Sequence, residues 1–326
     1  MVIGKGNIMR NTILYGDYRE TLKQFDEQAR TCITSPPYYG LRDYGGEENQ
    51  IGQEKTPEEF IDQLVSVFKE VRNVLTDDGT LWINLGDSYY NYRPGKGQSY
   101  PKQSVSKTNQ DLPTQCNKRG NKLEGLKEKD LIGIPWMFAF AMRSDGWYLR
   151  QDIIWHKPNP MPESVKDRCT KSHEYIFLLS KNKKYYYDNE AIKEPVKQDW
   201  GTRNRTNGKY HNSGSGLSPH SGLTKSYDRK NKRDVWSITN KPYKGSHFAV
   251  FPPDLITPCI LAGSEKGDII LDPFMGSGTT AMVAKQLGRD YIGCELHEEY
   301  SNLIDQRVPV EVVAQETTNP LADLLY

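Results

Sequence analysis

The sequence lacks a long apolar segment, and its cysteines are few and scattered. No apolar run approaches the roughly 20 residues that a transmembrane helix needs. The N-terminal residues MVIGKGNIMRN contain no apolar stretch typical of a signal peptide. No two of the five cysteines form a CxxC pair, which argues against a disulfide framework or a structural zinc site. We therefore expect a cytoplasmic protein without a membrane segment, with reduced thiols and no metal.

The sequence also lacks a large net charge, but its charge is unevenly distributed. The formal net charge of the 326 residues is +1. Residues 91–130 and 197–234 each contain more Lys and Arg than Asp and Glu, and both are rich in Gly, Ser, Asn, Gln and Pro. We interpret them as basic insertions whose surface suits a polyanion. The alternative for each is a solvated loop without a partner.

Short apolar runs alternate with helical patterns along the chain. The clearest helix is expected over residues 57–75, where Thr56 is an N-cap and Pro57 the first helical position. Other helices are expected over residues 18–28, 134–146, 246–264 and 279–287, and strands over residues 11–17, 31–34, 80–90, 147–157, 172–181, 269–271 and 291–294. Residues 77–79 are expected to form a turn. This alternation predicts a parallel α/β sheet covered on both faces, with ligands at the carboxyl ends of its strands.

A glycine turn in the segment LDPFMGSGTT follows the strand at residues 269–271. It is not a phosphate-binding loop, because no Lys precedes Thr279, and it lacks the third glycine of a dinucleotide fingerprint. Asp272 opens the turn and suits a cationic ligand, whereas Glu295 ends the next strand and suits a ribose diol. A nucleoside that carries a sulfonium and an ammonium, S-adenosylmethionine, fits this pair. An ordinary tight turn is the alternative.

A rigid corner follows the strand at residues 31–34, in the segment TSPPY. Two prolines in succession can continue neither a helix nor a central strand ladder. The backbone carbonyls of Ser35 and Pro36 therefore point outward without a regular partner. We expect them to serve a ligand.

Three motifs in this order resemble the amino-methylating DNA methyltransferases, in the permuted order called the beta group. They are TSPPY (Thr34 to Tyr38), HFAVFP (His247 to Pro252) and LDPFMGSGTT (Leu271 to Thr280). The resemblance covers roughly residues 11–195 and 234–307. It implies a doubly wound, mostly parallel sheet of the class I S-adenosylmethionine-dependent methyltransferase type, with a small inserted target-recognition region and duplex DNA as the partner.

The resemblance also implies roles for individual residues. Glu295 matches the ribose-binding acid and Asp17 the acid that reads the adenine ring of the cofactor. The catalytic tetrapeptide is matched by Ser35, Pro36, Pro37 and Tyr38. The methionine-binding turn and the wall of the cofactor site are matched by Asp272, Phe274, Gly276, Gly278, Thr279, His247 and Phe248.

Ser35 indicates the target base, because in this family the first residue of the tetrapeptide is Ser in most N4-cytosine methylases and Asp or Asn in most adenine methylases. N4-methylation of a flipped-out cytosine is therefore expected, with N6-adenine methylation as the alternative. A non-catalytic DNA-binding module and an RNA substrate are further alternatives. No covalent enzyme intermediate is needed, and Cys259, inside an apolar-periodic segment, is expected to be an inert buried thiol.

The other candidates have a structural interpretation beside the functional one. His173 and Glu174 could contact the flipped base or form a structural pair. Tyr185 to Tyr187 are expected as a packed strand face rather than a stacking platform, and His156, Lys157, Lys166 and Arg168 as loop residues that could meet phosphate.

The expected organisation is one methyltransferase domain with a variable part. Residues 1–195, with the insertion 91–130, hold the catalytic part, and residues 234–307 the cofactor-binding part. Residues 196–233 are expected to recognise the target sequence, and residues 308–326 form a C-terminal tail. A cognate restriction endonuclease is an expected partner. The oligomeric state is left open.

Overall fold

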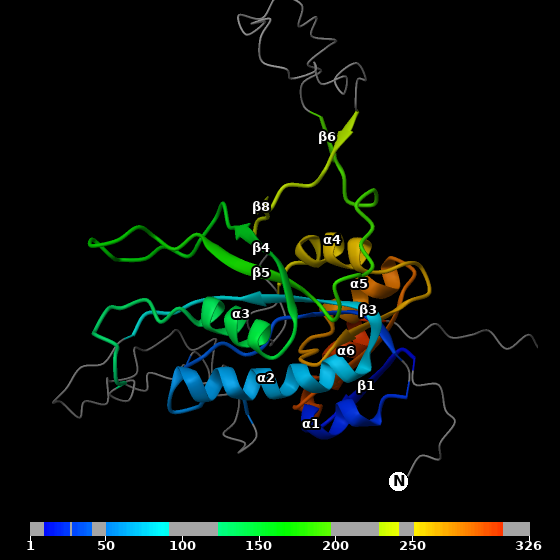
Figure 1. The fold of residues 1–326 in the computed structure, drawn as a ribbon, viewed down its shortest axis with the longest axis horizontal. Helices are drawn as coiled ribbons and strands as arrows, with labels where there is room; N and C mark the ends of the chain where they lie inside the picture. The colour runs from blue at the N-terminus through cyan, green and yellow to red at the C-terminus, as the bar shows by residue number, and fades with distance from the viewer. Residues whose placement is uncertain are drawn as a thin grey trace, which may run out of the picture.

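A central eight-stranded sheet organises the computed structural model, which describes residues 10–26, 28–40, 50–90, 123–196, 228–240 and 251–308. The strand order is β1-β10-β9-β2-β3-β5-β4-β8. Figure 1 labels β1, β3, β5, β4 and β8 of this sheet. The strands are β1 (Thr12–Tyr15), β2 (Ala29–Thr34), β3 (Leu75–Leu85), β4 (Tyr148–His156), β5 (His173–Ser180), β8 (Val235–Ser237), β9 (Ile269–Asp272) and β10 (Asp290–Glu295).

The sheet is mostly parallel, as expected. Strands β1, β10, β9, β2 and β3 run in parallel, and β4 is parallel to β8. Strand β5 is antiparallel to both of its neighbours, β3 and β4. The start of β5 therefore lies at the same edge of the sheet as the carboxyl ends of the other strands, which puts its first residues beside the predicted site.

Helices cover both faces of the sheet, and each face has its own apolar core. On one face, α2 (Pro57–Val74) and α3 (Ile134–Ser144) pack with residues such as Phe68 and Phe138. On the other face, α4 (Pro253–Gly263), α5 (Thr279–Gln286) and α6 (Ser301–Arg307) pack around Trp82 and Ile260. In Figure 1, α2 and α3 accordingly lie on the side of the sheet away from α4. This two-sided burial confirms the doubly wound architecture.

Helix α2 begins where its sequence predicts. Thr56 Oγ1 accepts a hydrogen bond from the Glu59 amide, and the Glu59 carboxylate accepts one from the Thr56 amide, which together form a capping box. Pro57 occupies the first turn, where its missing N–H costs nothing. Strand β3 follows directly after this helix.

Three local predictions were wrong. The expected helix at residues 18–28 consists only of α1 (Tyr18–Thr21) and a 3-10 turn, η1 (Leu22–Gln24), because Phe25 is already extended as the chain turns into β2. Residues 77–79 are not a separate turn but lie within β3, in a bulge opposite Arg30. Tyr185, Tyr186 and Tyr187 form no strand: Tyr187 stacks on Trp82, with ring centroids 6.3 Å apart.

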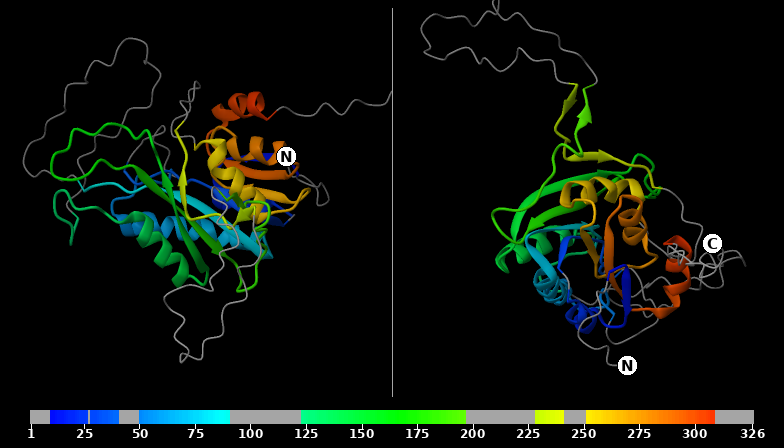
Figure 2. Two further views of the ribbon diagram at one scale, coloured as in Figure 1. Left: turned by 90° about the horizontal axis from the view of Figure 1, so that it is seen from above. Right: turned by 90° about the vertical axis from the view of Figure 1, so that its right-hand side faces the viewer.

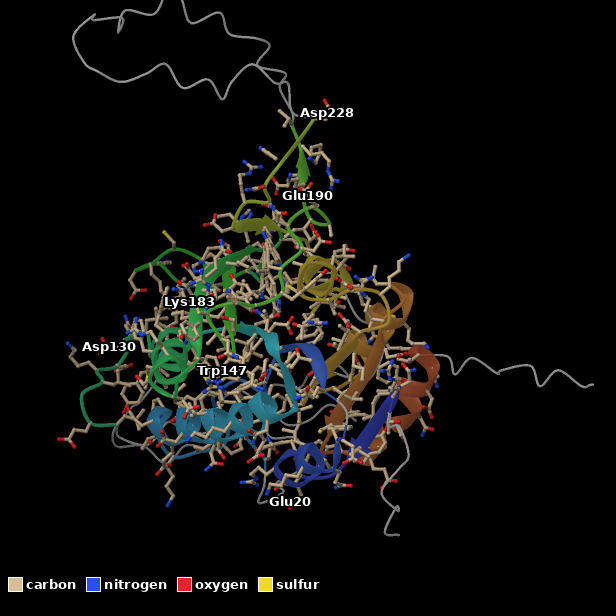
Figure 3. All side chains as sticks on the ribbon, turned by 45° about the vertical axis from the view of Figure 1, so that its right-hand side comes forward. Glu20, Asp130, Trp147, Lys183, Glu190 and Asp228 are labelled. Carbon is tan, nitrogen blue, oxygen red and sulfur yellow. The ribbon has the colours of Figure 1, made fainter. Side chains whose placement is uncertain are left out.

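A two-stranded ribbon projects from the body of the protein. It consists of β6 (Glu194–Pro195) and β7 (Arg229–Lys230), which pair in antiparallel fashion. Figure 2 shows the ribbon standing clear of the sheet, and Figure 3 shows Asp228 at its outer end, beyond Glu190. The Val196 amide donates to the Asp228 carbonyl (2.9 Å). Residues 196 and 228, the two ends of segment 197–227, are thus held together.

Among the residues that the structure describes, no helix is long and apolar enough to cross a membrane. The expected basic insertions lie mainly outside the described residues, which include 123–130 of the first and 228–234 of the second.

Candidate active site

The proline corner leaves the carboxyl end of β2, in the middle of the sheet. Thr34 is the last residue of that strand, Ser35 follows it, and Pro36 is buried. Among the described residues, none donates a hydrogen bond to the Pro36 carbonyl. A rigid backbone acceptor is therefore available there, as the two prolines predict.

The Tyr38 ring is fixed at both its edge and its face. Its hydroxyl donates to Glu174 Oε2 (2.8 Å) and lies 3.2 Å from Asn84 Oδ1. A Cβ added at Gly86 would come within 2.6 Å of the Tyr38 ring, so only glycine permits this approach. Burial, followed by the Glu174 charge, raises the pKa of Tyr38 well above its ordinary value. The phenol is therefore neutral at physiological pH.

Glu174 is itself held by two further donors. Lys157 Nζ donates to Glu174 Oε1, and the two side chains are only 16% and 15% exposed. Asn84 Nδ2 donates to Glu174 Oε2 (3.2 Å) and to the Tyr175 carbonyl (3.1 Å). The Lys157 ammonium also lies over the Trp155 ring, 4.2 Å from its centroid. The carboxylate thus has a defined position relative to the corner.

Asp272 is the first residue of the glycine turn, and both of its carboxylate oxygens accept hydrogen bonds from within the protein. Its Oδ1 accepts from Thr34 Oγ1 (2.5 Å) and the Phe274 amide (3.0 Å), and its Oδ2 accepts from Thr280 Oγ1 (2.6 Å). Burial raises its pKa to about 6 despite these bonds. The Asp272 carboxylate therefore joins the proline corner to the glycine turn.

The glycine turn itself is shaped by Glu295 and by α6. Glu295 Oε2 accepts from the Gly276 amide (2.7 Å), and its Oε1 accepts from the His297 amide (3.0 Å). Gly278 adopts the left-handed backbone conformation (φ 78°), which favours glycine. Behind the turn, Arg307 donates to the Ser277 carbonyl (3.1 Å) and to Ser277 Oγ. Burial raises the pKa of Glu295.

A further acidic residue lies at the end of β1. Asp17 caps α1 by accepting from the Arg19 amide (2.9 Å), and it pairs with the Arg19 guanidinium (2.7 Å). Burial opposes ionisation, but the hydrogen bonds and charge of Arg19 lower the pKa of Asp17 below its ordinary value. The next residue, Tyr18, packs edge-on against Phe274, with ring centroids 5.2 Å apart.

Two buried hydroxyls near the glycine turn are unsatisfied. Among the described residues, Tyr18 Oη and Thr279 Oγ1 are buried and have no hydrogen-bond partner. Such groups cost free energy unless a ligand or water completes them. These two hydroxyls and the Glu295 carboxylate form a donor and acceptor set beside the apolar Phe274 ring. The combination fits a nucleoside with a polar tail.

The structure brings together the predicted residues that it describes. The corner lies at the end of β2, the glycine turn at the end of β9, Glu295 at the end of β10 and Asp17 after β1. Adjacent parallel strands deliver all of them to one edge of the sheet. His247 and Phe248 lie outside the described residues.

Sequence reasoning underrated or missed several residues around the corner. Glu174 and Lys157 were weak candidates, whereas Thr34, Asn84 and Gly86 were assigned no role. The sequence carries only a weak signal for these residues: the hydroxyl of Thr34 shortly before the prolines, and the acid Glu174 at the start of an apolar strand. Because β5 runs antiparallel, that acid faces the corner.

The remaining candidates have structural partners or lie away from the corner. Arg168 pairs with Glu163 (2.6 Å) and lies over the Tyr89 ring. Cys259 is buried in α4, where burial raises its pKa, as expected of an inert thiol. Within the described residues, no cluster of His, Cys, Asp and Glu could hold a metal ion.

Comparison with known proteins identifies the family. A family model described as DNA methylase, for N6 and N4 amino methylation, matches residues 29–306. The chain belongs to this family. Type II methyltransferase M.SmaI of Serratia marcescens is 47% identical over 305 residues, which cover 93% of this chain and 92% of that protein. M.Cfr9I of Citrobacter freundii, also a Type II methyltransferase, is 45% identical over 304 residues, or 92% and 88% of the two chains.

Solved structures show the same fold. PvuII DNA methyltransferase, described as cytosine-N4-specific, superposes with a TM-score of 0.59 at 19% identity, over 94% of this chain and 88% of that one. M1.HpyAVI in complex with S-adenosylmethionine gives a TM-score of 0.53 at 17% identity, over 92% and 99%. This DNA methylase thus has the class I fold in beta-group order. The donor and acceptor set at the glycine turn would suit S-adenosylmethionine, the compound bound in the M1.HpyAVI complex.

Proposed function

We propose that this DNA methylase transfers a methyl group to the exocyclic N4 nitrogen of a cytosine flipped out of duplex DNA. The observation that carries the proposal is the position of Ser35. It begins the rigid corner at the end of β2, directly after Thr34, whose hydroxyl bonds to Asp272 of the glycine turn (2.5 Å). This arrangement supports a hydroxyl acceptor close to the glycine turn.

The corner suits the chemistry of an amino group. The exocyclic nitrogen of cytosine is a poor nucleophile because its lone pair is delocalised into the ring. Ser35 Oγ and the Pro36 carbonyl would accept its two hydrogens, so that the nitrogen rehybridises and directs its lone pair outward. Because these acceptors are already held rigidly in position, the reaction spends no free energy on reorienting them. S-adenosylmethionine supplies the electrophilic methyl group when bound.

The burial of the corner supports base flipping. Pro36 is buried, and a base stacked in a duplex cannot reach such a position without leaving the helix. We assign the stacking contact with the extruded base to the Tyr38 ring, which Gly86 and Glu174 hold in place.

The cofactor contacts are proposed for the residues around the glycine turn. Glu295 would bind the ribose diol with the acceptor capacity that remains after its two amide bonds. Asp17 would read the adenine ring. The remaining contacts are assigned to Asp272, Phe274, Gly276, Gly278, Thr279, His247 and Phe248. For Asp272 the supporting role is indirect, because its carboxylate already accepts three hydrogen bonds within the protein.

Identification of the methylated base tests this proposal. The purified protein would be incubated with labelled S-adenosylmethionine and mixed-sequence duplex DNA, and the DNA digested to nucleosides for mass spectrometry. N4-methylcytosine is the expected product. N6-methyladenine would retain the cofactor and the corner but would overturn the role of Ser35 in choosing the base. Structured RNA in a parallel reaction tests the alternative substrate.

We further propose that residues 196–233 recognise the target sequence, as the basic insertion predicts. Because Val196 and Asp228 are hydrogen-bonded, residues 197–227 can be replaced by a short Gly-Ser linker without separating the two strands of the ribbon. The replacement should abolish sequence-specific DNA binding and leave cofactor binding intact. Loss of both would make the segment part of the catalytic core. A cognate restriction endonuclease would share the same recognition sequence.

A further inference from the structure

We propose that Met161 fills the gap that the target base leaves when it swings out of duplex DNA. The inference rests on the base flipping of the proposed function, and it names the side chain that stabilises the flipped state. Met161 lies in the loop of residues 157–172, which connects β4 to β5.

Met161 is the most exposed large apolar residue that the structure describes. It is 84% exposed, whereas the other exposed large apolar residues of the described part are between 36% and 56% exposed. It also belongs to neither of the two apolar cores formed by the described residues. Isolated exposed apolar residues are common on protein surfaces, but the loop that carries Met161 is stiff and is attached to the proline corner.

The loop is stiff because its first part is rich in proline. The segment PNPMP contains three prolines that alternate with Asn159 and Met161. Each proline fixes its own φ and restricts the residue before it to extended geometry. The Asn159 side chain also exchanges two hydrogen bonds with the Asn240 backbone, from its Nδ2 to the carbonyl (3.2 Å) and from the amide to its Oδ1 (3.1 Å). Little backbone entropy is therefore left to lose when Met161 contacts a ligand.

The loop is attached to the corner at its base. The Lys157 amide donates to the Ser172 carbonyl (2.8 Å), which closes the loop. The Lys157 ammonium donates to Glu174, which also accepts from the Tyr38 hydroxyl (2.8 Å). Met161 follows four residues after Lys157, so their Cα atoms are at most about 14 Å apart. Figure 1 shows the loop projecting to the left, beyond the ends of β4 and β5. DNA with a base in the corner would lie within reach of Met161.

The charge of the loop suits the phosphates of such a duplex. Its basic residues outnumber its acidic residues, Glu163 and Asp167, and are Lys157, Lys166, Arg168 and Lys171. Both acids are paired, Glu163 with Arg168 (2.6 Å) and Asp167 with Lys129 (2.6 Å). Lys166 is exposed and has no ion-pair partner among the described residues. Its ammonium can therefore neutralise a phosphate while Met161 contacts the bases.

A side chain in the gap would make flipping less unfavourable. Extrusion of a base breaks its pairing and its stacking contacts, which exposes the faces of the neighbouring bases. Apolar side chains, Met among them, insert between base steps in other DNA-binding proteins. The unbranched Met side chain also adapts to gaps of irregular shape. Met161 would bury its exposed surface against these faces without contacting the reacting atoms.

A mismatch opposite the target base tests the inference. The methylated position is first mapped with the wild-type protein, and duplexes are then made with the correct or a mismatched base opposite it. Wild type, Met161→Ala and Met161→Leu are compared in single-turnover methyl transfer at saturating DNA. On the matched duplex Met161→Ala should be slower by about 10- to 100-fold, the factor that corresponds to burial of one apolar side chain.

The other two comparisons separate flipping from DNA binding. Met161→Leu should stay close to the wild-type rate, because apolar substitutions that conserve volume are tolerated best. On the mismatched duplex the difference between Met161→Ala and the wild type should largely disappear, because an unpaired base is extruded at lower cost. A fluorescent base analogue at the target position measures unstacking directly, and its signal should be smaller with Met161→Ala on the matched duplex.

The matched control is Tyr148→Ala. Tyr148 is also an exposed large apolar residue, 44% exposed, but it is the first residue of β4 and lies at the opposite end of that strand from the loop. This variant should retain the wild-type rate and the wild-type unstacking signal on both duplexes.

Two results would overturn the inference. A wild-type rate for Met161→Ala on the matched duplex would show that flipping needs no side chain at this position. An equal loss on the matched and mismatched duplexes would assign Met161 to DNA binding or folding instead. Failure of the proposed function reads out differently: wild-type protein without an unstacking signal would reject base flipping itself, and N6-methyladenine as the product would reject only the target base.

Discussion

Thr34 and Asp272 are 238 positions apart in the sequence, yet the Thr34 hydroxyl donates to the Asp272 carboxylate over 2.5 Å. One residue precedes the proline corner and the other opens the glycine turn. The bond therefore sets the spacing between the site proposed for the amino group and the site proposed for the methyl donor. Strands β2 and β9 carry the two residues and are direct neighbours in the sheet.

Thr34→Val removes this bond without changing the shape of the side chain. We expect a loss of about 1.5–3 kcal/mol of unfolding free energy, the range for a hydrogen bond to a charged group, and a larger relative loss of turnover than of cofactor affinity. Thr31→Val is the control: Thr31 lies in β2, like Thr34, but its hydroxyl bonds to Thr80 of β3 and does not reach the turn. Urea unfolding and steady-state kinetics check both. Equal turnover in the two variants would contradict the role of the Thr34 bond.

Ser35→Ala should lower turnover far more than cofactor affinity. The substitution removes one of the two proposed acceptors of the amino hydrogens but leaves the prolines and the glycine turn in place. Loss of one preorganised polar group typically costs on the order of 100- to 1000-fold in rate. Single-turnover kinetics and equilibrium dialysis with labelled cofactor measure the two quantities. A turnover close to that of the wild type would remove Ser35 from the mechanism.

Glu295→Gln should weaken cofactor binding. The neutral amide keeps the size of the side chain, but it presents one acceptor oxygen where the carboxylate presents two. We expect cofactor affinity to fall about 10- to 100-fold, as for the loss of a hydrogen bond to a charged group. The control is Glu298→Gln, three residues further along the chain in the 3-10 turn η4 (Glu298–Tyr300). Unaltered cofactor affinity in Glu295→Gln would assign the ribose contact elsewhere.

Gly86→Ala tests the packing of Tyr38. The added methyl group would lie 2.6 Å from the Tyr38 ring, and the ring cannot retreat without breaking its bond to Glu174. Turnover should therefore fall, with little change in cofactor affinity, since the three atoms nearest to the added methyl group all belong to the Tyr38 ring. Thermal stability measured in parallel separates displacement of the ring from general unfolding. Wild-type turnover would show that the position of the ring is not critical.

The raised pKa of Asp272 makes a pH-dependent contribution to stability. Folding raises this pKa from 3.8 to about 6, so the folded state binds the proton more tightly than the unfolded state. The contribution of this carboxyl is therefore fully present below about pH 4 and is lost as the pH rises through about 6. At about 1.4 kcal/mol per pKa unit, the loss amounts to roughly 3 kcal/mol.

Asp272→Asn isolates this contribution, because the amide does not titrate. The unfolding free energy of the wild type relative to the variant should fall between pH 4 and pH 7, as measured by urea unfolding at a series of pH values. A difference that is constant over this range would show that folding leaves the Asp272 pKa unchanged.

The fold was largely predictable because its strands and helices have local signals. The capping box at Thr56 and the apolar spacing of α2 specify a helix from neighbouring residues alone. Local signals failed where long-range pairing prevailed. Residues 77–79 carry a turn sequence, yet they lie within β3, because Leu75 and Thr80 both pair with β2. The helix expected to continue through Phe25 ends early because the chain must enter β2.

By itself, the sequence determined the local chemistry of this DNA methylase: a rigid corner beginning with Ser35, a glycine turn without a phosphate-binding Lys, and an acid at the end of each flanking strand. These features depend only on the types and spacing of residues that are close together in the sequence. Only the tertiary structure decided which distant groups act on that chemistry. Antiparallel β5 brings Glu174 to Tyr38, and the neighbouring strands β2 and β9 bring Thr34 to Asp272. Strand order and direction arise from burial of the whole sheet, which no short segment encodes.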